Sequence, residues 1–328
     1  MPKLNIDTGS ISGQQIYDTD TFPLVRQADG STLQESVEWI QDQRGDLDER
    51  VQQHGAILFR GFGLVTDQDF DEFVSAFDYP NFSYADSLSN AVRVNRTERV
   101  FTANEAPAEV TICLHHEMAQ TPVFPSRLFF FCEQPATTGG ATPLCRSDVL
   151  LKKLQAEFPK FVDACRSSGL RYRNVMPAQD DPISGMGRSW QSTLSVSSNS
   201  DAENRLRKLG YDWQWQADGS LQAATPRLDA VRSNPAGREA FFNQLIAASQ
   251  GWKDNLNEPS KSVTYGDGSP LDTAAVLRAA ELADDLAIDV PWQAGDVVLV
   301  DNIIVMHGRR TFTGTRKILA SLAAAENA

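Results

Sequence analysis

Apolar residues recur at helical spacing in two segments near the beginning of the chain. From Ser36 to Gln53 they fall near one face of a helix, and from Asp67 to Phe77 they occupy positions i, i+3, i+4 and i+7. Between these segments lies HGAILFRGF, at His54–Phe62, a short apolar run closed by a glycine. This order predicts a helix, a buried strand and a second, amphipathic helix that covers one side of a sheet.

Strand-like runs dominate the middle of the chain. Val110–Met118 and Arg127–Gln134 are rich in β-branched and aromatic residues, and a turn at Pro122–Pro125 separates them. A turn with two glycines follows, and then SDVLLKKLQAEF predicts a helix with Ser147 or Asp148 as its N-cap. We therefore expect mainly strands here, with helices between them.

A long polar stretch precedes the last part of the chain. Residues 176–289 are rich in Ser, Asn, Asp and Gly, and they contain one clear helical pattern, at Leu271–Leu286. Residues 291–324 then form three apolar strand-like runs, interrupted by DN and by GRRTFTG. We expect the polar stretch to be an insertion that decorates a β core and offers loops for ligand contacts.

Composition and charge limit the class of protein. The 328 residues are 41% hydrophobic and 9% aromatic, which is enough to bury a large core and argues against a disordered chain. Lys and Arg total 30 against 43 Asp and Glu, so the formal charge of -13 opposes binding to nucleic acid. No run approaches the length of a membrane span, and the first residues lack the pattern of a signal peptide. We expect a cytoplasmic protein that binds neither nucleic acid nor membranes.

The cysteines give no sign of a metal site or a disulfide framework. Cys113, Cys132, Cys145 and Cys165 lie tens of residues apart, without a CxxC pair. Free thiols in apolar runs pack as small hydrophobic groups. We therefore interpret all four as reduced residues of the core.

Histidines and one acidic residue form the strongest chemical pattern. His115 and Glu117 are two apart in a strand-like run, so alternation directs both to one face and His116 to the other. His307 ends another apolar run just before a glycine, where its side chain can reach the same pocket. Two imidazoles and a carboxylate are the ligand set of non-haem Fe(II) oxygenases. Taken alone, however, HxE is also consistent with a core histidine and a carboxylate at a strand edge.

A cationic pair begins the last strand-like run. Arg316 and Lys317 follow His307 closely and precede the apolar sequence ILASL. A cation at the start of a buried strand favours an anionic partner, and a carboxylate would bind an arginine through two parallel hydrogen bonds. The alternative is a strand end exposed to solvent.

LHHEM, GGATPL and DNIIVMHGRRTFTGTRKIL together resemble the Fe(II)- and 2-oxoglutarate-dependent dioxygenases of the taurine dioxygenase family, nearest to the syringomycin-cluster amino-acid hydroxylases. The similarity extends from about Gly55 to Leu322. It implies that His115, Glu117 and His307 bind iron. It also implies that 2-oxoglutarate binds Thr142, in GGATPL, and Arg316, or Lys317 if the alignment shifts by one residue.

The resemblance also implies a fold. The family has a mainly β, mixed α/β architecture, a double-stranded β-helix or jelly roll of the clavaminate synthase-like kind, with flanking helices. We expect one dioxygenase domain over residues 1–328. Its jelly-roll core would comprise about 50–175 and 290–325, and the insertion over about 176–289 would form a lid.

The activity that the resemblance implies is hydroxylation of an unactivated carbon of a small amino acid or amino-acid-like acid. Fe(II), 2-oxoglutarate and O2 would take part, with release of succinate and CO2. Related halogenases have Ala or Gly where this chain has Glu117, so its carboxylate favours hydroxylation over halogenation. Asn104, Asn243 and Arg310 are the residues we expect to contact the substrate.

Several alternatives stay open at this point. The substrate is expected to be a small molecule, free or tethered to a carrier protein, although the acidic chain is poorly suited to an acidic carrier. A homo-oligomer is compatible with the sequence. The same His, Glu and His set also fits a zinc hydrolase, and a jelly roll without catalytic activity can serve as a binding protein.

Overall fold

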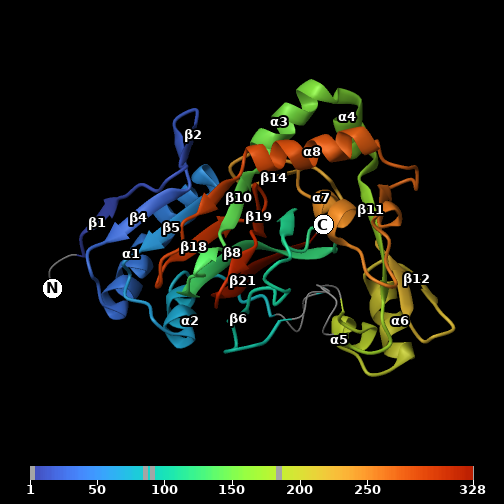
Figure 1. Cartoon of the computed structure of the whole chain (residues 1–328), viewed down its shortest axis with the longest axis horizontal. Coiled ribbons are helices and arrows are strands. Elements are labelled where there is room, and N and C mark those ends of the chain that lie inside the picture. Colours follow the sequence, from blue (N-terminus) through green and yellow to red (C-terminus); the bar gives the residue numbers. More distant parts are fainter. Residues whose placement is uncertain (1–3, 84–87, 89–92, 182–186, 328) are drawn as a thin grey trace.

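Two facing β-sheets form the centre of the computed structural model, which describes residues 4–83, 88, 93–181 and 187–327 (Figure 1). The larger sheet has seven strands, in the order β1 (Ile6–Thr8), β4 (Leu24–Ala28), β5 (Ala56–Arg60), β18 (Val297–Asp301), β8 (Val123–Gln134), β21 (Lys317–Asn327) and β6 (Phe101–Thr102). The smaller sheet has four strands, in the order β17 (Ile288–Val290), β10 (Thr142–Arg146), β19 (Val305–Arg309) and β7 (Ile112–His115). Neighbouring strands in both sheets are antiparallel, apart from the parallel pair β4 and β5.

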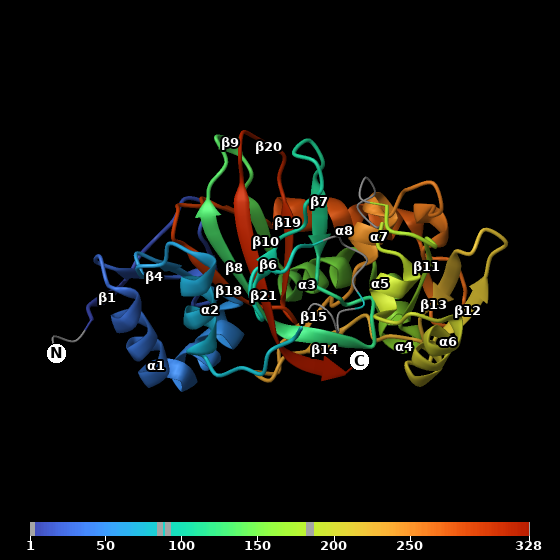
Figure 2. The ribbon, with the colours of Figure 1, turned by 90° about the horizontal axis from the view of Figure 1, so that it is seen from below.

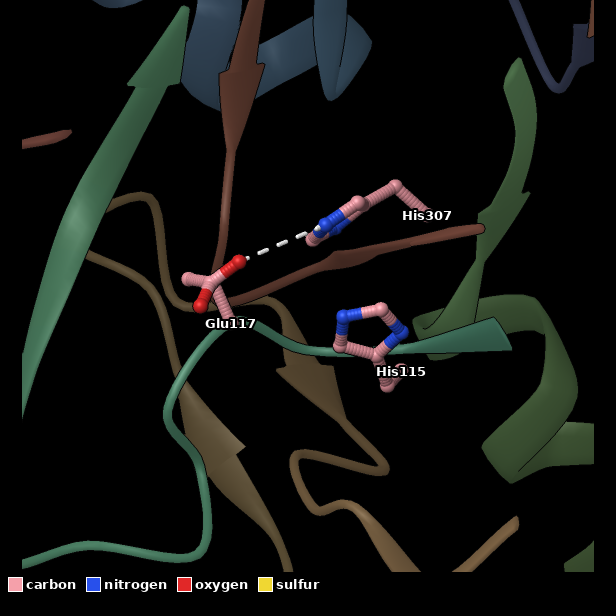
Figure 3. Close-up of side chains that lie close together, drawn as sticks. All are labelled: His115, Glu117 and His307. Carbon is pink, nitrogen blue, oxygen red and sulfur yellow. Dashed lines mark ion pairs between the residues drawn. The ribbon is translucent and has the colours of Figure 1, made fainter. Parts of the chain in front are cut away.

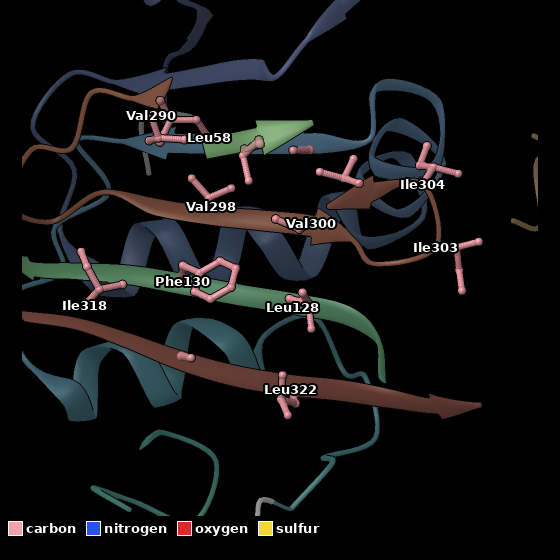
Figure 4. Close-up of a cluster of buried hydrophobic side chains, with 14 of the residues drawn as sticks. Leu58, Leu128, Phe130, Val290, Val298, Val300, Ile303, Ile304, Ile318 and Leu322 are labelled. Atoms are coloured by element: carbon pink, nitrogen blue, oxygen red, sulfur yellow. The ribbon is translucent and has the colours of Figure 1, made fainter. Parts of the chain in front are cut away.

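The strands of the larger sheet are apolar throughout because their side chains point alternately to two faces that are both covered. In β8, Leu128 and Phe130 face the space between the two sheets, whereas Phe129 and Phe131 face the opposite side. Figure 4 shows the inner face, where side chains from β5, β18, β8 and β21 lie in one layer. Both faces of the sheet are therefore buried, which confirms the predicted β core of the jelly-roll type.

Helices cover the outer face of the larger sheet. Helix α1 (Leu33–His54) and helix α2 (Asp67–Ser75) pack their apolar residues against the outward-facing side chains of β5, β8 and β18. Each helix begins with a capping box, formed by Thr32 with Glu35 and by Thr66 with Asp69. The predicted helix, strand and amphipathic helix are thus all present.

The outer face of the smaller sheet packs against four further helices, α3 (Ser147–Glu157), α4 (Pro159–Ser168), α7 (Leu245–Gly251) and α8 (Thr273–Asp285). In Figure 2, α3 and α8 lie behind β10, β19 and β7, on the side of the molecule away from α1. The prediction of a side-chain N-cap at Ser147 or Asp148 was wrong. Arg146 is the residue before the helix, no side chain caps it, and the Asp148 carboxylate instead forms an ion pair with Arg146 at 2.6 Å.

The polar stretch at 176–289 contains more regular structure than its pattern indicated. Besides α7 and α8 it forms α5 (Trp190–Leu194), α6 (Asn199–Lys208) and a 3-10 turn at Pro259–Lys261. Three of its strands join β11 in a third sheet, in the order β12 (Asp212–Trp215), β13 (Leu221–Ala224), β11 (Leu170–Met176) and β16 (Val263–Tyr265). A separate apolar cluster that includes Trp190 and Leu206 holds α5 and α6 against this sheet. The insertion therefore has a small core of its own.

Three short two-stranded sheets complete the described structure. They are β2 (Gln15–Tyr17) with β3 (Asp20–Phe22), β9 (Thr138–Gly139) with β20 (Phe312–Thr313), and β14 (Arg232–Ser233) with β15 (Glu239–Ala240). In the described ranges, no helix combines the length and the apolar character that crossing a bilayer requires.

Candidate metal centre

Three side chains that can bind a metal meet between the two sheets. His115, Glu117 and His307 each offer a ligand atom, and these atoms all lie within 4.8 Å of one another. Figure 3 shows His115 and Glu117 on one segment and His307 opposite them on β19, with the ion pair between Glu117 Oε2 and His307 Nε2 at 3.6 Å. Among the residues that the structure describes, this is the one cluster of its kind.

Strand register brings the two histidines together. His115, at the end of β7, pairs directly with His307 on β19, and their ring centroids lie 4.4 Å apart. Alternation along β19 directs Val305 inwards and Met306 outwards, so His307 points inwards again. The position of His307 follows from the same period-2 pattern that buries its neighbours.

Glu117 reaches the cluster by a different route from the one that alternation predicts. Strand β7 ends at His115, and Glu117 lies in the turn before β8. The buried side chain of Asn302 fixes this turn, because its Oδ1 accepts from the backbone N of Glu117 at 2.8 Å and its Nδ2 donates to the backbone O of Glu117 at 2.9 Å. Sequence reasoning interpreted the DN pair at 301–302 only as a turn and missed this role.

His116 faces away from the cluster. Its ring is fully buried and lies 4.9 Å from the ring of Phe242, and its Nδ1 is hydrogen-bonded to the backbone O of Asn302. Burial lowers its pKa to about 3, so the ring is neutral at ordinary pH. The prediction that His116 points to the other face from His115 and Glu117 agrees with this placement.

The hydrogen bond of His115 leaves one ring nitrogen available to a metal. Its Nδ1 lies 2.8 Å from the backbone O of Cys113, and because a carbonyl oxygen only accepts, Nδ1 carries the proton. Nε2 then keeps its lone pair. Burial, together with the nearby His307, lowers the pKa of His115 to about 4, so the neutral form required of a ligand prevails at neutral pH.

An arginine that sequence reasoning missed contacts Glu117. Nη2 of Arg93 donates to Oε1 at 3.1 Å and to Oε2 at 2.9 Å. Burial alone would raise the pKa of the Glu117 carboxyl, but Arg93 and His307 hold it well below its usual range. Arg93 belongs to a polar stretch without helical or strand periodicity, so no signal in the sequence connects it with Glu117.

A cavity of about 200 Å³ adjoins the three side chains. The predicted residues Asn104, Thr142 and Arg316 line it, together with Arg93 and Arg309. Arg316 donates to the backbone O of Gly140 at 2.7 Å and to Oγ1 of Thr142 at 3.2 Å. The residues predicted from separate parts of the sequence therefore line one cavity.

Lys317, the alternative to Arg316, lies elsewhere. Its side chain is 54% exposed, and its Nζ lies 3.7 Å from Oε2 of Glu133. It is not among the residues that line the cavity. The geometry thus favours Arg316 as the cation that faces the site.

Two predicted substrate contacts are not brought to the cavity. Asn243 is buried, and its amide bonds the backbone of Ala230 and of Leu245. The guanidinium of Arg310 forms ion pairs with Asp284 at 2.6 Å and with Asp289 at 2.9 Å. Neither residue lines the cavity, because the backbone in one case and two carboxylates in the other hold the side chain away from it.

The donor set fits a divalent iron ion. Two imidazoles and one carboxylate on a single side of a cavity would leave the remaining coordination positions open to small ligands. The residues present therefore suit a 2-His-1-carboxylate iron site.

Comparison with known proteins identifies the class. Residues 19–322 match the family described as "Taurine catabolism dioxygenase TauD, TfdA family", and the chain belongs to this family. It is a dioxygenase that depends on iron, 2-oxoglutarate and oxygen. This result confirms the predicted oxygenase over the zinc hydrolase and the non-catalytic binding protein.

Two curated relatives and two solved structures illustrate the relationship. A clavaminate synthase-like protein of Arabidopsis thaliana is 37% identical over 98% of this chain and 99% of its own length. The dapdiamide synthesis protein DdaC of Enterobacter agglomerans is 31% identical over 84% of each chain. A taurine dioxygenase from Burkholderia xenovorans superposes with a TM-score of 0.55 at 13% identity, covering 99% of this chain and 92% of that one. AAD-2, in complex with Mn(II) and N-oxalylglycine, gives 0.54 at 13% identity, with 99% of both chains covered.

Proposed function

We propose that the chain binds Fe(II) through His115, Glu117 and His307 and hydroxylates a small amino acid or an amino-acid-like acid. The observation that carries this proposal is the convergence of the three side chains on one wall of the cavity. This donor set is typical of non-haem Fe(II) oxygenases. Bound iron and 2-oxoglutarate together supply the activation of oxygen that oxidation of a C–H bond requires.

We assign Arg316 and Thr142 to the binding of 2-oxoglutarate. In the described part of the chain, the Arg316 guanidinium donates to neutral oxygens and has no carboxylate within ion-pair distance. Burial and the nearby Arg309 lower its pKa to about 10, so it stays charged at neutral pH. The distal carboxylate of 2-oxoglutarate would supply the missing anion, and the Thr142 hydroxyl would contact the same end of the molecule.

Hydroxylation is the outcome that Glu117 supports. Its carboxylate occupies the third ligand position, which related halogenases leave to a residue without a carboxylate. Asn104 lines the cavity next to the proposed iron site and is our remaining candidate for a substrate contact. The similarity to DdaC, a protein named for dapdiamide synthesis, supports a role in making a small amino-acid-derived molecule.

The test is succinate formation from 2-oxoglutarate by protein loaded anaerobically with Fe(II) and then exposed to oxygen, with a panel of free amino acids and small acids. We expect one class of compound to stimulate turnover, and the His115→Ala variant to show none. Absence of succinate from wild-type protein that retains iron would contradict the proposal.

A substrate tethered to a carrier protein is the second form of the same proposal. Slow succinate formation that no free compound stimulates would favour it, and aminoacylated carrier domains would then replace the panel. The charge of -13 argues for a carrier with a basic docking face.

A further inference from the structure

Arg93 and Glu117 form an ion pair inside the cavity. Nη2 of Arg93 lies 2.9 Å from Oε2 and 3.1 Å from Oε1, and the two side chains are only 8% and 4% exposed. Because both groups are removed from water, their contact is screened much less than a surface ion pair. It therefore constrains where the Glu117 carboxylate lies.

The constraint matters because the ligand is a glutamate. Glutamate has one more rotatable bond than aspartate, so its carboxylate samples more positions, and ordering it costs conformational entropy. Asn302 holds only the backbone of Glu117. The end of the side chain is fixed by other contacts, of which those with Arg93, at 2.9 and 3.1 Å, are shorter than the one with His307, at 3.6 Å.

Arg93 is itself held in place by the edge of the larger sheet. Its neighbour Val94 accepts a hydrogen bond from the backbone N of Thr102 at 2.9 Å and donates to Oγ1 of Thr102 at 3.0 Å. The guanidinium also stacks over the ring of Phe101, 5.2 Å from its centroid. Strand β6 thus positions Arg93 before any ligand enters the cavity.

We propose that Arg93 is a positioning residue for the metal centre. Through one nitrogen, Nη2, it contacts both oxygens of the Glu117 carboxylate and so holds the carboxylate at the position from which it would bind the ion. Partners of this kind, which orient a metal ligand, typically change metal affinity by 10- to 100-fold when they are removed. This inference rests on the metal centre proposed above.

Mn(II) binding, followed by electron paramagnetic resonance without 2-oxoglutarate or substrate, tests the inference independently of turnover. We expect Arg93→Met to weaken Mn(II) binding by about 10- to 100-fold and to change the spectrum of the bound ion, and Arg93→Lys to recover part of the affinity. Arg96→Met is the matched control. Arg96 pairs with Asp67 outside the cavity, so its replacement should leave Mn(II) binding unchanged.

A double-mutant cycle separates positioning from folding. Glu117→Asp is the second background, because the shorter side chain keeps a carboxylate near the ion but withdraws it from Arg93. If Arg93 acts through Glu117, Arg93→Met should have a much smaller effect on Mn(II) affinity in this background. An equal loss in both backgrounds would overturn the inference. Unchanged Mn(II) affinity in Arg93→Met would also overturn it, even if the variant bound substrate more weakly.

Failure of the inference differs from failure of the metal centre. If His115→Ala and Glu117→Ala bind Mn(II) like the wild-type protein, the three-residue site is wrong. If they lose Mn(II) and Arg93→Met does not, the site stands and only the role of Arg93 is wrong. Circular dichroism and thermal unfolding of each variant establish that it is folded.

Discussion

At the scale of single residues, the adjacent His115 and His116 point in opposite directions. His115 ends a strand and turns a nitrogen lone pair towards the cavity, whereas His116 is enclosed by Phe242 and the backbone of Asn302. Burial lowers the pKa of both rings. What distinguishes them is direction, because only His115 faces Glu117 and His307.

Alanine substitutions should separate these two roles. His115→Ala and Glu117→Ala should lose bound iron and turnover, because each removes a proposed ligand. His116→Ala should keep its iron but lose about 2 to 4 kcal/mol of unfolding free energy, from the cavity it leaves and the hydrogen bond it loses. Iron content and thermal unfolding measure the two effects. Loss of iron in all three variants would contradict the assignment.

The two neighbouring cations should respond differently to removal. Arg316→Ala should raise the 2-oxoglutarate concentration needed for half-maximal turnover by at least 100-fold, since leaving a buried charge without its partner costs about 3 to 5 kcal/mol. Lys317→Ala should have little effect, because its exposed amine pairs only with Glu133. Succinate formation at varied 2-oxoglutarate measures both, and the reverse order would shift the assignment by one residue.

The thiols should react slowly while the protein is folded. All four cysteines are free, and burial raises the pKa of each, to about 12 for Cys132 and Cys165. A raised pKa reduces the thiolate fraction at pH 8, and the thiolate is the reactive form. Cys132, Cys145 and Cys165 are buried, whereas Cys113, which was expected in the core, is only partly buried and lines the cavity. A chromogenic disulfide reagent should therefore detect the three buried thiols promptly only after unfolding. Prompt reaction of more than one thiol in the native protein would show that this burial is transient.

At the scale of elements, one side chain holds a wall of the cavity. The guanidinium of Arg309, on β19, donates to the backbone oxygens of Asn104, Ala106, Pro107 and Val110 at 2.6 to 3.3 Å. The segment it binds connects β6 to β7 and contributes several cavity-lining residues. An irregular segment is thus fixed from a neighbouring strand and not by its own secondary structure.

Removing this anchor should loosen the segment 104–110. We expect Arg309→Met to raise the KM for substrate and to make the segment sensitive to limited proteolysis, with iron content unchanged. Arg310→Met is the neighbouring control, because that guanidinium binds Asp284 and Asp289 outside the cavity. Equal effects in the two variants would indicate a general loss of stability.

Elements with a clear period were predictable from the sequence, and positions fixed by long-range polar contacts were not. Apolar runs predicted β8 and β18, and helical spacing predicted α1, α2 and α8. The turn expected at Pro122–Pro125 was wrong, because β8 already begins at Val123. Alternation directed Glu117 to the correct site, although a turn held by Asn302 places it there. Arg93 had no detectable signal, because its contact with Glu117 depends on the meeting of two sheets. Helix α6 was missed because its exposed face is polar throughout.

At the scale of the whole molecule, charge is distributed unevenly. The chain carries a formal charge of -13, yet the described residues that line the cavity include Arg93, Lys253, Arg309 and Arg316 against the single carboxylate of Glu117. An anionic cosubstrate therefore meets a repulsive exterior and an attractive interior. The interior outweighs the exterior at short range, because salt screens distant charges first.

The larger sheet depends on strands from both ends of the sequence. In this sheet β8 lies between β18 and β21, and both of these strands follow the insertion in the sequence. A fragment of residues 1–290 should therefore expose the apolar edges of β8 and associate into large particles. Light scattering and sedimentation measure this, and a monomeric fragment would contradict it. Co-expression of residues 291–328 should restore part of the soluble material.

The late pairing of β8 has a consequence during synthesis. A ribosome delivers Leu128 to Phe131 well before it delivers β18 and β21, at about 5 to 20 residues per second. For several seconds or more the nascent chain carries an apolar strand with no partner on either side. We therefore expect the nascent chain to be most prone to aggregation in this interval, before the sheet that carries the cavity can close.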